Sequence, residues 1–75
     1  MSEEIRKKIL KTAVNGYPEY VGMKEFLDST KLSQDILEKH LKYLEESGYL
    51  KVRWSSAGFI AEATINAIEY LGEAS

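Results

Sequence analysis

The chain has 75 residues, the size of one domain, and its formal net charge of −2 differs from the strongly basic signature of many DNA-binding domains. It has no cysteine, which excludes disulfides and thiolate metal sites and suits a reducing cytoplasm. No apolar run approaches the roughly 20 residues of a membrane span, and the acidic start of MSEEIRKKIL is unlike a signal peptide. We therefore expect a small cytoplasmic domain without membrane association, to which dimerisation would add buried area.

The charges are distributed unevenly along the chain. Residues 1–16 hold four basic side chains and residues 31–53 hold five, whereas only acids follow Ala57. This pattern predicts a dipolar molecule with an acidic C-terminal side. The four N-terminal cations go around their helix rather than forming one row, so we expect most of them to be solvated; they are Arg6, Lys7, Lys8 and Lys11.

The pattern predicts a first helix over residues 2–15. Ser2 is a favourable N-cap, and apolar residues spaced four and five apart give one broad apolar face. Gly16 is expected to end this helix in the left-handed conformation, and Pro18 prevents its continuation.

Two further helices are predicted around a tight turn. After a possible very short strand at residues 20–21, one helix should cover residues 23–29 and the other residues 33–47, with Ser33 as its N-cap and Gly48 as its end. The third helix has one apolar stripe at i, i+4 and i+7, formed by Leu37, Leu41 and Leu44.

Beyond Gly48 the apolar period changes from that of a helix to that of a strand. Leu50, Val52 and Trp54 alternate with Lys51 and Arg53, so one face is apolar and the other is basic. The sequence SSAG is a plausible hairpin turn, which predicts a hairpin over residues 49–63.

Thr64 is then expected to cap a last helix over residues 64–71, which Gly72 ends after about two turns. The whole order predicts one mostly helical α+β domain over residues 1–75, a winged helix-turn-helix. Its parts are a three-helix core, a two-stranded β-wing and a short C-terminal helix.

The segment LSQDILEKHLKYLEESGYLKV resembles the recognition-helix region of winged-helix regulators of the ArsR and MarR kind. The matching residues are Ser33, His40, Leu41, Leu44, Gly48, Tyr49 and Leu50. The segment ATINAIEYLG is similar to the one after the wing in small archaeal members, although Ala67 replaces the usual glycine. The resemblance covers residues 5–71.

This resemblance implies a transcriptional regulator, prokaryotic, archaeal or from an archaeal virus, that binds duplex DNA as a homodimer. It places the third helix in the major groove and the wing over the backbone. The metal-binding cysteines of ArsR are absent, so metal sensing is not carried over, and no cofactor or small-molecule ligand is evident.

On the third helix, the face expected to enter the groove consists of Gln34, Asp35, Glu38, Lys39 and Lys42. Gln34 is suited to adenine, and the two lysines to guanine or phosphate. The alternative is a solvated face with a Glu38–Lys42 pair. Asp35 also suits the helix dipole, but Glu38 lies in the middle of the face and opposes phosphate binding.

On the wing, Lys51 and Arg53 are expected to contact phosphates together with Lys31, while Ser55 and Ser56 at the tip donate hydrogen bonds to the backbone. The alternative is solvated charge on a hairpin. Trp54 is expected to pack under the wing, with a partner contact as the second possibility.

Other functions find less support in the sequence. His40 is expected to be a half-buried helix residue rather than a metal ligand. No motif supplies a nucleophile with a base or a phosphate-binding glycine loop, so an enzyme is not expected. The remaining alternative is a winged helix that binds protein rather than DNA, which the acidic balance and Glu38 favour.

Overall fold

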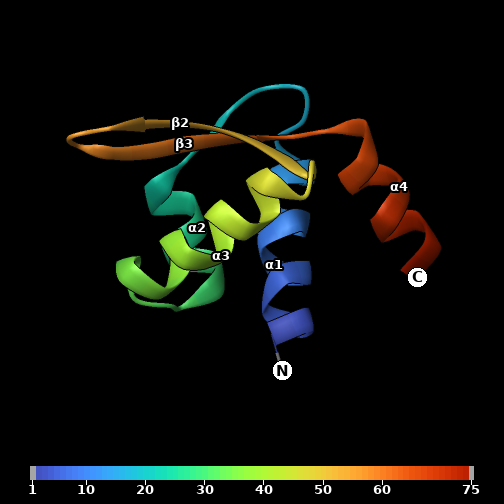
Figure 1. The fold of residues 1–75 in the computed structure, drawn as a ribbon, viewed down its shortest axis with the longest axis horizontal. Coiled ribbons are helices and arrows are strands. Elements are labelled where there is room, and N and C mark those ends of the chain that lie inside the picture. The colour runs from blue at the N-terminus through green and yellow to red at the C-terminus, as the bar shows by residue number, and fades with distance from the viewer. Residues whose placement is uncertain (1, 75) are drawn as a thin grey trace.

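Four helices and a three-stranded antiparallel sheet form within residues 2–74, the part of the chain that this computed structural model describes (Figure 1). The elements are α1 (Ser2–Asn15), β1 (Val21–Gly22), α2 (Met23–Thr30), α3 (Gln34–Glu46), β2 (Leu50–Ser55), β3 (Gly58–Ala63) and α4 (Ile65–Ala74). A helix pair followed by a hairpin gives a winged-helix-like arrangement. The predicted fold class, mostly helical α+β, is therefore confirmed.

The sheet has the strand order β1-β3-β2. The hairpin pairs Leu50 with Ala63 at its base and Ser55 with Gly58 at its tip, which leaves a two-residue turn. The strand expected at residues 20–21 forms one residue later, where Val21 pairs with Ala61 on the other side of β3. In Figure 1 the helices lie on one side of this sheet, and the tip of the hairpin projects beyond them.

The core lies between the sheet and the helices, and α4 contributes Ala67 to it. The leucine stripe of α3 is buried as predicted, and it meets Ile9 and Leu10 of α1. The ring of Phe26 from α2 lies 5.8 Å from that of Phe59 on β3, measured between centroids. No helix within residues 2–74 is both long and apolar enough to cross a membrane.

Both ends of α3 are capped by the residues that the sequence indicated. The Ser33 side chain accepts a hydrogen bond from the Ile36 N–H. Gly48 has φ +86°, and the N–H of Tyr49 donates to the Leu44 carbonyl at 2.9 Å. With the 3.1 Å bond from Gly48 to the Glu45 carbonyl, this is a complete Schellman motif, which turns the chain from α3 into the hairpin.

Helix α1 ends at Asn15 as predicted, but the left-handed conformation expected at Gly16 and the helix end expected at Gly72 are wrong. Gly16 is not among the left-handed residues; after α1 the chain turns through hydrogen bonds such as Gly16 N–H to the Ala13 carbonyl at 3.1 Å. A Cβ at position 16 would lie 2.5 Å from Val21 Cγ2, so what this position requires is close packing. Gly72 lies inside α4, which has 10 residues rather than the expected two turns.

The first and last caps have different outcomes. Helix α1 begins at Ser2 as predicted, but the Ser2 side chain lies outside the described part of the structure. The Thr64 hydroxyl accepts from the Ala67 N–H at 3.4 Å and donates to the Gly48 carbonyl at 2.7 Å. Thr64 therefore caps α4 as predicted and also ties it to the end of α3.

Candidate nucleic-acid interface

The outer face of α3 is largely accessible. Gln34, Asp35, Lys39 and Lys42 are exposed, whereas Glu38 is half-buried. Ser33, as N-cap, orients the first turn, and the buried leucines on the opposite side fix the rotation of the helix. Of the five residues predicted for this face, the structure therefore exposes the two lysines, the amide and the Asp35 carboxylate.

Glu38 is engaged by its neighbour one turn earlier. Gln34 Nε2 donates to Glu38 Oε2 at 2.9 Å, so the structure forms this pair rather than the Glu38–Lys42 pair that the spacing suggested. An amide nitrogen has two hydrogens, and Gln34 keeps one of them and its carbonyl oxygen for another partner. Glu38 therefore restrains Gln34 while Lys42 is left to other contacts.

Lys42 instead faces the wing through Trp54. The Lys42 Nζ lies 5.7 Å from the centroid of the Trp54 ring, and Trp54 Nε1 donates to Glu45 Oε1 at 3.4 Å. Trp54 also lies 5.7 Å from the Phe59 ring and remains 40 % exposed. It is thus only partly under the wing, contrary to the expectation of a packed side chain, and it connects the hairpin to α3.

The wing cations point elsewhere. Side chains alternate across a strand, so Lys51 and Arg53 lie on the face of β2 opposite to Leu50 and Trp54 and away from the helices. Lys51 is directly across from Glu62 on β3. The Arg53 Cζ lies 5.4 Å from the centroid of the Tyr20 ring. The structure therefore does not bring these two cations beside the lysines of α3.

The remaining predicted site residues are exposed at turns. Lys31 ends α2 with φ 62°, and its N–H donates to the Leu27 carbonyl at 2.9 Å. Ser55 and Ser56 lie at the hairpin tip, and the Ser55 hydroxyl donates within the hairpin to the Gly58 carbonyl at 3.4 Å. Within the hairpin, the Ser56 hydroxyl makes no hydrogen bond like that of Ser55.

The sequence patterns assigned no function to the other flank of α3. Ile36 and Tyr43 are 46 % and 47 % exposed, one on each side of the half-buried His40. The Arg6 Cζ lies 3.7 Å from the centroid of the Tyr43 ring, so this cation is stacked rather than simply solvated. Burial, and secondarily the charge of Arg6, lowers the pKa of His40 below 6.5 and favours its neutral form. Periodicity places Arg6 on an exposed side of α1 but cannot indicate which helix lies opposite.

Comparison with known proteins gives one informative result. No protein-family model and no curated protein matches the chain. Its fold is similar to that of Sso10a-2, a DNA-binding protein from Sulfolobus solfataricus, with a TM-score of 0.78 over 97 % of this chain and 73 % of that one. Because the sequence identity is only 18 %, this similarity establishes a shared fold and does not extend to function.

Proposed function

We propose that this chain binds duplex DNA, with α3 in the major groove and the hairpin tip over the adjacent backbone, and that it acts as a small transcriptional regulator. The observation that supports this most strongly is the exposed face of α3, with Gln34, Lys39 and Lys42, on a fold shared with a DNA-binding protein. The major groove admits such a helix and gives each base pair a distinct pattern of donors and acceptors.

The geometry of α3 supports a separate role for each of its outward residues. Lys39 and Lys42 contact guanine or phosphate, and Gln34 reaches adenine with its second amide hydrogen and its carbonyl. Asp35 remains at the favourable N-terminal end of the helix dipole. Glu38 restrains Gln34 rather than contacting DNA, because it is half-buried and accepts the Gln34 hydrogen bond.

The turns and the wing supply backbone contacts. Lys31 and Ser56 approach phosphates beside the groove, and Ser55 does so after giving up its bond to Gly58. Lys51 and Arg53 extend the contact along the outer side of the hairpin. As a homodimer, the protein would place its two α3 helices in successive major grooves about 34 Å apart, as the resemblance to ArsR and MarR regulators implies.

Salt dependence tests this proposal directly. If about five cations per subunit neutralise phosphates, log affinity falls with a slope near −4.5 against log salt, which is about 500-fold between about 50 and 200 mM. A gel-shift titration on mixed-sequence duplex DNA measures this. Lys39→Ala and Lys42→Ala should each weaken binding and reduce the slope by about 1. Lys11→Ala, an exposed cation on α1, is the matched control and should leave both unchanged.

A second function has its own support in the charge pattern. Asp35 and Glu46 are exposed on the same helix as the lysines, and Lys51 and Arg53 point to the other side of the sheet. These features suit a winged helix that binds a protein partner. Failure of micromolar protein to shift any duplex at low salt would contradict the DNA proposal and favour this alternative.

A further inference from the structure

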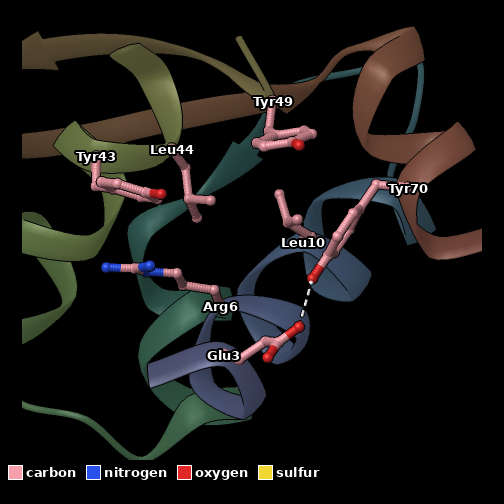
Figure 2. A pocket seen from close by; sticks show the side chains of 7 residues that line it. All are labelled: Glu3, Arg6, Leu10, Tyr43, Leu44, Tyr49 and Tyr70. Carbon is pink, nitrogen blue, oxygen red and sulfur yellow. Dashed lines mark hydrogen bonds between the residues drawn. The ribbon is translucent and has the colours of Figure 1, made fainter. Parts of the chain in front are cut away.

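A pocket of about 460 Å³ opens between α1, α3 and α4 (Figure 2). Its volume lies in the lower part of the range of roughly 300–1,000 Å³ that is typical of ligand sites. Helix α1 contributes Glu3, Arg6 and Leu10, and the other walls include the rings of Tyr43, Tyr49 and Tyr70. The pocket thus combines both signs of charge with aromatic walls, and it does not include the lysines of the proposed DNA interface.

Arg6 has a hydrogen-bond donor without an acceptor in this pocket. Its Nε is buried and has no hydrogen-bond partner within residues 2–74. The guanidinium lies over the Tyr43 ring, with its Cζ 3.7 Å from the ring centroid, and Arg6 is one of the residues that line the pocket. Native proteins rarely leave a buried donor unpaired, and a carboxylate is the acceptor whose two oxygens match the guanidinium fork.

Glu3 provides the opposite charge, about one turn before Arg6 on α1. Figure 2 shows Arg6 turned towards Tyr43 and Glu3 turned towards Tyr70. The Tyr70 hydroxyl donates to Glu3 Oε2 at 3.4 Å, and burial together with the Glu3 charge raises the pKa of Tyr70, so the hydroxyl remains the donor. The second oxygen of Glu3 and the nearby tyrosine rings suit an ammonium group, which is attracted to carboxylates and to ring faces.

Two leucines and the faces of tyrosine rings give the pocket apolar surface beside its charges. Leu10 and Leu44 line it, and the rings of Tyr49 and Tyr70 lie 5.4 Å apart at one side. An apolar or aromatic body would cover the two leucines and the ring faces there and remove that apolar surface from water. We propose that this pocket binds a small zwitterion with an aromatic body, its carboxylate on Arg6 and its ammonium beside Glu3. This inference does not depend on DNA binding.

Calorimetric titration of the intact chain tests the ligand class. The probes are L-phenylalanine, whose charges share one carbon atom, and 4-(aminomethyl)benzoate, whose charges lie at opposite ends of a ring. At least one should bind at a single site, and its analogues lacking either the carboxylate or the ammonium should bind at least about tenfold more weakly. Absence of binding by both probes at millimolar concentration, or equal binding of all analogues, overturns the proposal.

Variants then assign the two charges. Arg6→Met should weaken binding of the zwitterion about tenfold and leave binding of the analogue without a carboxylate unaffected. Glu3→Gln should likewise weaken binding of the zwitterion and leave binding of the analogue without an ammonium unaffected. Lys11→Met removes a cation of α1 outside the pocket and is the matched control. If Arg6→Met does not fold, the Glu3→Gln comparison alone decides. Affinities that stay unchanged in both variants contradict the assignment. Sedimentation experiments in which a second copy of the chain fills the pocket also contradict it.

Discussion

Gly48 controls how α3 turns into the wing, and Gly48→Ala tests that role. The residue has φ +86°, where an L side chain is strained. A Cβ there would meet Asn66 Nδ2 at 3.5 Å, an ordinary contact, so the substitution introduces strain without a clash. The strain of a left-handed L-residue is roughly 1–2 kcal/mol. We expect the free energy of unfolding to fall by about that amount.

Thermal and urea unfolding followed by circular dichroism measure this loss. For a domain of this size about 1 kcal/mol corresponds to about 4–8 °C, so the melting temperature should fall by about 4–16 °C. The urea m-value should not change, because the same surface is exposed on unfolding.

Two comparison variants isolate the backbone effect. Gly48→Asn should cost less than Gly48→Ala, because asparagine tolerates the left-handed region. Gly72→Ala places a methyl group on α4 with nothing within 4 Å and should stabilise the protein by up to about 1 kcal/mol. If Gly48→Ala is as stable as the parent, or if alanine and asparagine cost the same, the left-handed cap does not account for this glycine.

Three other outcomes follow from local geometry. Lys31→Gly should raise the free energy of unfolding by up to about 1 kcal/mol because φ is 62°, whereas Lys31→Ala should bring no gain in urea titrations. Gly16→Ala should destabilise by about 1–3 kcal/mol through its 2.5 Å approach to Val21, and part of that loss should disappear when Val21→Ala is added. The lowered pKa of His40 means that the unfolded chain binds its proton at higher pH than the folded chain. Stability should therefore decrease as the pH falls through about 6.5, and His40→Gln should remove that component between about pH 7.5 and 5.5.

Local signals predicted the elements around α3 well. The Ser33 cap, the Gly48 stop and the Thr64 cap each act through hydrogen bonds between residues close in sequence, so their residue types carry the information. Gly16 and Gly72 show the limit of such signals. A glycine suits a left-handed stop, but it also suits close packing, as at Val21, or a position inside a helix. Only the neighbours decide between these uses.

For the candidate interface, the sequence by itself determined that α3 presents Gln34, Lys39 and Lys42 outward, because the leucine stripe must face the core. Tertiary structure decided which side chains meet across elements. In the folded protein Lys42 lies near the Trp54 ring, and Lys51 and Arg53 point away from α3. Arg6 lies over the Tyr43 ring beside a pocket that no sequence motif predicts. The physical reason is that periodicity specifies the face of one element, whereas contacts between elements depend on how several faces pack together.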